Sequence, residues 1–268
     1  MPSHHLPATH YNLTIGWLYP ELMSTYGDRG NIISLTKRCE WRGIEVKILP
    51  ISHATKDEQI TTIDLLFGGG AQDREQEMVM EDLKKKGRII RFLIEKGLPA
   101  LFVCGAPQLM GKYYEPAVGK RIQGLGIFDM VSKHPGEDVA RLTGNVVAKI
   151  IRENLEPSAE RLLSNDIMIG FENHGGRTYL GSSARPLAKV IKGNGNNGDD
   201  HTEGVIYKNA IGSYFHGPLL PKNSSIADYL LSVALSRKYK EDLVLSSLDD
   251  ALEKQAQQVI AKRLGVEL

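Results

Sequence analysis

The chain has 268 residues, of which 41% are hydrophobic and 24% are charged, and its formal net charge is +1 at pH 7. These values are ordinary for a globular protein of one large domain, and the small charge excludes a general electrostatic attraction to nucleic acid or to an anionic membrane. Two distant cysteines exclude a disulfide framework, and no apolar run approaches the roughly 20 residues of a membrane-spanning helix, so we expect a cytoplasmic protein with no membrane span and no nucleic-acid partner.

Strands and helical segments alternate over the first hundred residues. This alternation is typical of an α/β fold with a doubly wound, mostly parallel sheet and helices on both faces, as in flavodoxin-like proteins. Ligands of such sheets bind beyond the carboxyl ends of the strands, where a turn-rich loop at 26–31 and a triple glycine at 68–70 are expected. The predicted segments are strands at 13–18, 45–49, 63–67 and 100–103, and helices at 32–42 and 72–95, the second with a break expected near Gly87.

Shorter strands replace most helices after about residue 120. They indicate an antiparallel extension of the sheet, followed by C-terminal helices. The glycine- and asparagine-rich stretch 192–200 is predicted to be a flexible surface hairpin or loop. The predicted strands lie at 126–131, 142–151, 166–171 and 204–215, and the helices at 224–237 and 249–264. The expected organisation is a disordered lead-in at 1–12, one domain at 13–240 and a helical appendage at 241–268.

Cys104 stands at a predicted junction of strand, turn and helix. An apolar strand ends at Val103, glycine and proline follow the cysteine, and a helix is predicted from Gln108. A nucleophile elbow needs this arrangement, because the turn lifts the side chain clear of the sheet and points backbone N–H groups at the same place. The alternative is an inert cysteine buried at the end of a core strand.

His216 is the best candidate for the base that a cysteine nucleophile needs. A predicted strand delivers it to a Gly-Pro turn at 217–218. An imidazole beside the thiol would take its proton and later return one to the leaving group. His174 also follows a predicted strand and competes for this role.

Acyl transfer further requires backbone donors for an oxyanion. The Gly105 N–H directly follows the cysteine and is the natural first donor, and Gly69, Gly70 or Ala71 could supply the second. No cluster of cysteines and histidines has the spacing of a zinc site, so no metal is expected.

Three motifs together make a family resemblance. They are Asp-Leu-Leu-Phe-Gly-Gly-Gly-Ala-Gln-Asp at 64–73, Cys-Gly-Ala-Pro-Gln-Leu-Met-Gly at 104–111 and Tyr-Phe-His-Gly-Pro at 214–218. They resemble a class I glutamine amidotransferase domain of the cobyric-acid-synthase-like branch. Segments at 26–31, 141–144 and 170–177 are most similar to the GatD subunits of that branch.

The resemblance implies an enzyme subunit that hydrolyses L-glutamine to glutamate and ammonia. The ammonia would pass to MurT, a Mur-ligase-like partner that amidates D-glutamate of the peptidoglycan precursor lipid II to D-isoglutamine. ATP and Mg²⁺ are expected in that partner, and no cofactor is implied in this subunit.

The resemblance also assigns roles to residues of this chain. Cys104 becomes the nucleophile and His216 the base, and the loop of Gly69 and Gly70 forms the oxyanion hole with Gly105. Two further residues would bind the glutamine. Gln108 would help to hold it, and Arg141 would bind its α-carboxylate, with a surface ion pair as the alternative for Arg141.

Two positions depart from the usual pattern of the class. Pro107 lacks an N–H, which the first turn of a helix tolerates. The acid of the usual triad stands two residues after the histidine, where this chain has Pro218. Glu172 is the predicted replacement, and an acid donated by the partner is the alternative.

Other functions remain open at this point. The chain could be a stand-alone cysteine hydrolase, the amidotransferase subunit of another synthetase such as a cobyric-acid-type enzyme, or a catalytically silent module that only binds a ligase. The presence of both Cys104 and His216 argues against the silent module.

Overall fold

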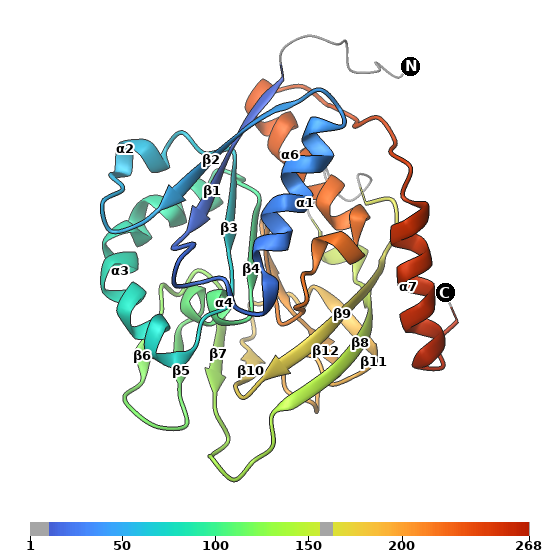
Figure 1. Cartoon of the computed structure of the whole chain (residues 1–268). Helices are drawn as coiled ribbons and strands as arrows, with labels where there is room; N and C mark the ends of the chain where they lie inside the picture. The colour runs from blue at the N-terminus through green and yellow to red at the C-terminus, as the bar shows by residue number, and fades with distance from the viewer. Residues whose placement is uncertain (1–10, 156–162, 268) are drawn as a thin grey trace.

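A six-stranded sheet forms the centre of the fold (Figure 1). The computed structural model describes residues 11–155 and 163–267. The sheet order is β13-β14-β4-β3-β1-β2, and its neighbouring strands pair in parallel except β13, which pairs antiparallel with β14. The expected doubly wound sheet is therefore confirmed. The strands are β1 (Asn12–Leu18), β2 (Glu45–Ile51), β3 (Leu65–Gly68), β4 (Ala100–Val103), β13 (Val205–Tyr207) and β14 (Ala210–Ser213).

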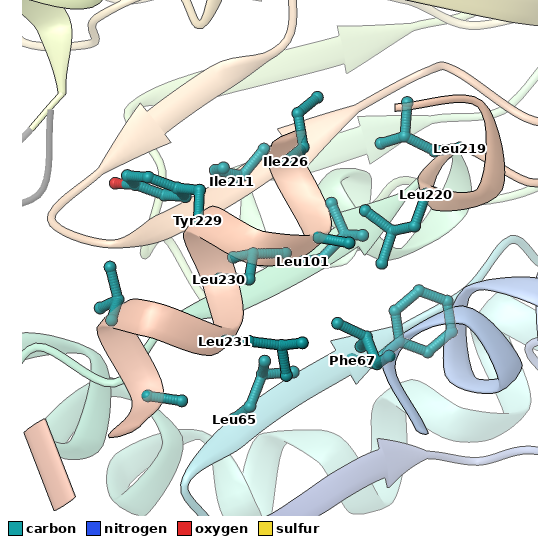
Figure 2. Close-up of a cluster of buried hydrophobic side chains, with 14 of the residues drawn as sticks. Leu65, Phe67, Leu101, Ile211, Leu219, Leu220, Ile226, Tyr229, Leu230 and Leu231 are labelled. Atoms are coloured by element: carbon teal, nitrogen blue, oxygen red, sulfur yellow. The ribbon is translucent and has the colours of Figure 1, made fainter. Parts of the chain in front are cut away.

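Helices cover both faces of this sheet because the central strands are apolar on both sides. In β3, Leu65 and Phe67 face one core and Leu66 faces the other. Figure 2 shows Leu65 beneath Leu230 and Leu231 of the helix α6 (Ser224–Tyr239). The first core is covered by α1 (Arg29–Glu40) and α6 (Ser224–Tyr239), and the second by α3 (Asp73–Glu95) and α4 (Gly105–Met110).

The long helix α3 runs without the break expected near Gly87. Gly87 is buried, and a Cβ at this position would lie 2.7 Å from Cδ2 of Leu125. The glycine therefore allows close packing rather than ending the helix, although glycine costs about 1 kcal/mol of helix propensity relative to alanine. A short helix, α2 (Asp57–Ile60), precedes β3.

The strands of the second half of the chain form two further sheets. Their orders are β10-β7-β5-β6 and β12-β11-β8-β9, so the expected antiparallel extension of the central sheet is limited to β13. A backbone bridge between Phe171 and His216 joins β9 to the segment after β14. The bounds are β5 (Tyr113–Glu115), β6 (Ile122–Gln123), β7 (Met130–Lys133), β8 (Leu142–Ile150), β9 (Ile167–His174), β10 (Arg177–Leu180), β11 (Ala188–Lys192) and β12 (Thr202–Glu203).

The stretch 192–200 is partly a buried element, so the prediction of a surface loop is wrong for its centre. Asn196 and Asn197 are 2% and 5% exposed. The Asn196 side chain donates to the Gly204 carbonyl and accepts from the Gly204 N–H, and Asn197 donates to the Thr178 carbonyl. Buried amides bonded to the backbone fix a loop that composition alone would leave free.

The C-terminal helix α7 (Ala251–Arg263) packs beside β8 and β9 (Figure 1). Ala261 forms a small apolar cluster with Val147 and Ile169. At the other end, β1 starts at Asn12, and residues 1–10 of the expected lead-in lie outside the described residues. Within the described parts of the chain, no helix is both long and apolar enough to cross a bilayer.

Candidate active site

Cys104 occupies a strained turn between β4 and α4, as the elbow prediction requires. Its φ is +56° and its ψ is −100°, a conformation that is costly for a residue with a Cβ and that persists only where the surroundings enforce it. The Cys104 N–H donates to the Ser213 carbonyl at 2.8 Å, which fixes the turn to the end of β14. Cys104 as a whole is 9% exposed.

A cavity of about 500 Å³ opens above this thiol. This volume suits a small molecule such as an amino acid. Its wall combines the loop after β1, the loop after β3, the elbow and the end of β9, so the carboxyl ends of several strands contribute, as expected for a doubly wound sheet. The lining residues are Thr25, Tyr26, Ala71, Gln72, Asp73, Arg74, Gln76, Cys104, Gln108, Tyr114, Arg141, His174, Gly175 and Gly176.

His216 is fully buried and faces an aspartate. Its Nδ1 lies 3.5 Å from Oδ1 of Asp28, whose side chain is also fully buried. Burial favours the neutral imidazole, but the interactions of His216 with Cys104 and Asp28 outweigh it and raise the pKa of His216 to about 10. A histidine between a thiol and a carboxylate has the arrangement of a catalytic triad.

The structure does not bring the Glu172 carboxylate, predicted to orient His216, to that histidine; Asp28 lies there instead. In β9, Phe171 forms the backbone bridge to His216, and side chains of successive strand residues point to opposite faces, so Glu172 is directed elsewhere. Its carboxylate accepts hydrogen bonds from the Asn194 backbone and side chain and from the Gly195 N–H. Burial alone would raise the pKa of Glu172, but the neighbouring His174 and these bonds lower it.

Sequence reasoning missed Asp28 and Tyr26. Both lie in the turn-rich loop after β1, which the sequence places at the ligand-binding edge of the sheet but with no catalytic role for either residue. Tyr26 has a φ of +54° and places its ring edge-on to His216, with centroids 4.9 Å apart. The sequence feature that could indicate a role for Tyr26 and Asp28 is that their loop follows a central parallel strand, at the edge where ligands bind.

The oxyanion donors differ in part from the prediction. The Gly70 N–H already donates to Oδ2 of Asp28 at 2.6 Å, so it is not available to a substrate. Ala71 lines the cavity, and a Cβ on Gly105 would lie 2.9 Å from the Ala71 backbone nitrogen. The backbone N–H groups of Gly105 and Ala71 are therefore the best-placed pair.

Gly69 shapes the same loop by allowing a close approach. A Cβ there would lie 2.4 Å from the Met23 carbonyl oxygen, which no side chain could tolerate without a shift. A Cβ on Gly70 would lie equally close to the hydroxyl of Thr25. Both glycines thus hold the loop against the segment that carries Asp28 and do not themselves contact the cavity.

Gln108 lines the cavity, but both ends of its amide bind protein groups. Its Nε2 donates to the Tyr214 hydroxyl at 2.9 Å, and its Oε1 accepts from Gln76 at 3.0 Å. Gln76 also donates to the Ala71 carbonyl at 3.1 Å. Gln108 therefore supports the loop of the oxyanion donors from its place in the cavity wall.

Arg141 lines the cavity, and its guanidinium is held by Asn173. Its Nε and Nη2 donate to the side chain and carbonyl of Asn173, at 2.8 and 2.7 Å. Nη1 faces Gly175, where a Cβ would lie 3.3 Å away. A planar guanidinium held in this way suits recognition of a carboxylate.

His174 forms part of the cavity wall and is not the base. Its ring stacks on Tyr214 with centroids 3.7 Å apart, and its Nδ1 hydrogen-bonds the Gly176 carbonyl oxygen at 2.7 Å. Across the described ranges of the chain, histidine, cysteine and acidic side chains form no group of three or more that could hold a metal ion.

The comparisons with known proteins identify the family of the chain. The model of the CobB/CobQ-like glutamine amidotransferase domain matches residues 14–224, most of the chain. The chain belongs to this family. The amidotransferase is 40% identical over 246 residues to the lipid II isoglutaminyl synthase (glutamine-hydrolyzing) subunit GatD of Streptococcus pneumoniae, covering 91% of this chain and 89% of that protein. The Staphylococcus aureus subunit of the same name is 37% identical, covering 94% and 96%.

A solved structure supports the fold of this amidotransferase independently. The glutaminase domain of CTPS from Trypanosoma brucei, with bound acivicin, superposes with a TM-score of 0.56 at 12% identity, covering 87% of this chain and 96% of that domain. At this identity the likeness shows the fold alone. The resemblance to glutamine amidotransferases and to GatD seen in the sequence is confirmed by the relatives.

The pKa of His216 leads to a prediction for the amidotransferase. Because the folded value of about 10 exceeds the ordinary 6.5, the charged imidazole stabilises the fold below pH 6.5, and this contribution is lost as the pH rises through about 10. NMR of ¹³C-labelled histidine should show His216 still protonated at pH 8, and Cys104→Ala should lower its midpoint because the thiol's contribution disappears. A wild-type midpoint near 6.5 would contradict the thiol–imidazole pairing.

Proposed function

We propose that the chain is the glutamine-hydrolysing GatD subunit of a lipid II isoglutaminyl synthase. Two relatives of nearly the same length carry this name, at 40% and 37% identity. The observation that carries the activity is the elbow cysteine at the floor of the cavity, beside a buried histidine that faces an aspartate. A catalytically silent module would have no need to keep this strained and buried arrangement.

Glutamine hydrolysis follows from these groups. The Cys104 thiolate attacks the side-chain amide carbon, and the oxyanion accepts hydrogen bonds from the Gly105 and Ala71 N–H groups. Collapse of this intermediate breaks the C–N bond, and imidazolium His216 gives its proton to the departing ammonia. His216 then takes a proton from water, which attacks the thioester and releases glutamate and the free thiol.

The ammonia is the substrate of a separate partner protein. We infer a Mur-ligase-like protein of the MurT type, which binds ATP and Mg²⁺ and activates the D-glutamate carboxyl of the lipid II stem peptide. The subunit itself needs no cofactor for the steps above, and the reaction is placed in the cytoplasm, where that ligase would find its nucleotide. The alternative acceptor belongs to another synthetase, such as a cobyric-acid-type enzyme.

Reconstitution of the full chain with its Mur-ligase-like partner tests the function. With lipid II, ATP, Mg²⁺ and glutamine, the complex should form amidated lipid II and glutamate. A complex carrying Cys104→Ala should lose glutamine-dependent amidation but keep amidation from added ammonium salts. Glutamine hydrolysis without any amidation of lipid II would support the glutaminase and overturn the assigned acceptor.

Arg141 provides a test of the glutamine site. Arg141→Ala should raise the KM for glutamine by about 10- to 100-fold, since a hydrogen bond to a charged group contributes about 1.5–3 kcal/mol, and should change kcat much less. Arg141→Lys should recover only part of the loss, because lysine cannot reproduce the planar fork. Steady-state ammonia release measures both constants, and an unchanged KM would return Arg141 to a purely structural role.

A further inference from the structure

Glu203 is a buried carboxylate that the mechanism above does not use. It ends β12, its exposed fraction is 0%, and it does not line the glutamine cavity. Its Oε1 accepts hydrogen bonds from the Ser213 hydroxyl at 2.6 Å and from the Tyr214 N–H at 3.0 Å. A carboxylate so deeply buried is costly unless its hydrogen bonds compensate, so these bonds identify what it holds.

The segment that Glu203 holds is the one that carries the base. The pairing of β14 with β4 ends at Ser213, opposite Val103, and the three buried residues that follow need other acceptors for their N–H groups. Glu203 accepts the Tyr214 N–H directly. It also accepts the Ser213 hydroxyl, and this hydroxyl in turn accepts the Phe215 N–H at 3.0 Å.

The same serine is bonded to the nucleophile. The Ser213 carbonyl accepts the Cys104 N–H at 2.8 Å, while the His216 N–H donates to Phe171 at 2.7 Å. Ser213 is therefore attached to Glu203 through its side chain and to the elbow through its backbone. A shift of Ser213 would move the elbow and the histidine segment relative to each other.

The two hydrogen bonds to Oε1 of Glu203 need an acceptor oxygen but not a negative charge. Burial raises the pKa of Glu203 to about 7, and the facing Glu172 carboxylate on β9 adds to this rise. Its second oxygen, Oε2, has no hydrogen-bond partner among the described residues. A neutral side chain of the same shape, with one acceptor oxygen, could therefore keep both bonds.

We propose that Glu203 is a positioning residue for glutamine hydrolysis, which acts through Ser213 to keep the His216 segment in register with Cys104. The proposal rests on the glutaminase activity proposed above. Glu203 touches neither glutamine nor the reacting atoms, so its effect is on geometry. A misplacement of about 1 Å in such a site can cost about 100-fold in rate.

The test uses the full chain in complex with its ligase partner. Ser213→Ala should lower kcat per active site about tenfold, with an unchanged KM for glutamine because Ser213 does not line the cavity. Glu203→Leu should lower it further, whereas Glu203→Gln should stay within about threefold of wild type because it keeps the acceptor. Active sites are counted as the fraction of chains in which iodoacetamide labels Cys104 but not the buried Cys39, because misfolded protein exposes both thiols.

Ser225→Ala is the matched control. Ser225 is a buried serine of α6 whose hydroxyl has no hydrogen-bond partner among the described residues, and its loss should leave kcat unchanged. If Glu203→Leu does not fold, Ser213→Ala still decides the question. Wild-type kcat per labelled site in Ser213→Ala, or a Glu203→Gln variant as slow as Glu203→Leu, would overturn the proposal.

The rate of labelling separates this proposal from the proposed function. Iodoacetamide reacts with Cys104 without glutamine, and the reaction should be several-fold slower in Ser213→Ala than in wild type, because the thiol and imidazole no longer align. Slow labelling in that variant would support the positioning role even if the wild type failed to hydrolyse glutamine. That failure would overturn the glutaminase assignment alone.

Discussion

Replacement of Cys104 by alanine should abolish glutamine hydrolysis, with a loss of at least about 10⁴-fold in kcat, since no other group can form the thioester. The fold should persist because the elbow is held by backbone bonds, such as that from the Cys104 N–H to Ser213. Alanine also keeps the Cβ at the positive φ, so no new strain arises. Ammonia release by the complex with the partner measures the effect, and circular dichroism checks the fold.

Cys39→Ala is the matched control for this prediction. Cys39 is a buried cysteine of α1 within the apolar core, and burial raises the pKa of its thiol to about 12, so it is inert as a nucleophile at neutral pH. Its replacement should leave turnover near the wild-type rate. Undiminished ammonia release from Cys104→Ala would remove the basis of the catalytic assignment.

Asp28→Asn should lower kcat by about 10²- to 10⁴-fold, the range seen when the acid of a triad loses its charge. The amide would keep the size of the side chain but no longer stabilise an imidazolium 3.5 Å away. The pKa of His216 should fall in the same variant, because Asp28 is one of the groups that raise it. Single-turnover release of ammonia, followed across pH, measures both effects.

Glu172→Gln separates the two candidate acids. Glu172 binds the loop at 194–195 and contacts His174, so its loss should destabilise that loop while changing kcat by less than about tenfold. If Glu172→Gln slowed the reaction more than Asp28→Asn, the assignment of the orienting acid to Asp28 would be wrong. An equal, small effect of both variants would favour an acid from the partner.

The periodic parts of the fold were accessible to sequence reasoning. β4 and the elbow depend on adjacent residues: an apolar run, then glycine and proline within three positions of Cys104. The central sheet followed from strands that alternate with helices. Gly87 shows the limit, because its role depends on Leu125, which lies 38 residues further along the chain.

The acid that orients His216 was not accessible in this way. The contact between Asp28 and His216 joins two loops that meet only because β1 and β14 end at the same edge of the sheet. Glu172 is nearer to His216 in sequence and also buried, but the alternation of β9 turns it away. The Gly70 N–H was likewise assigned to the substrate, because sequence does not show that Asp28 already accepts it.

The two carboxylate oxygens of Asp28 contact different parts of the acyl-transfer site, the oxyanion loop and the base. Oδ2 holds the loop that presents Ala71, and Oδ1 faces the base. Proton transfer and oxyanion binding therefore both depend on the position of Asp28. The losses of activation free energy from a mutation beside His216 and from one in the Gly70–Ala71 loop should not be additive. A shift of the Asp28 loop would therefore change both steps at once.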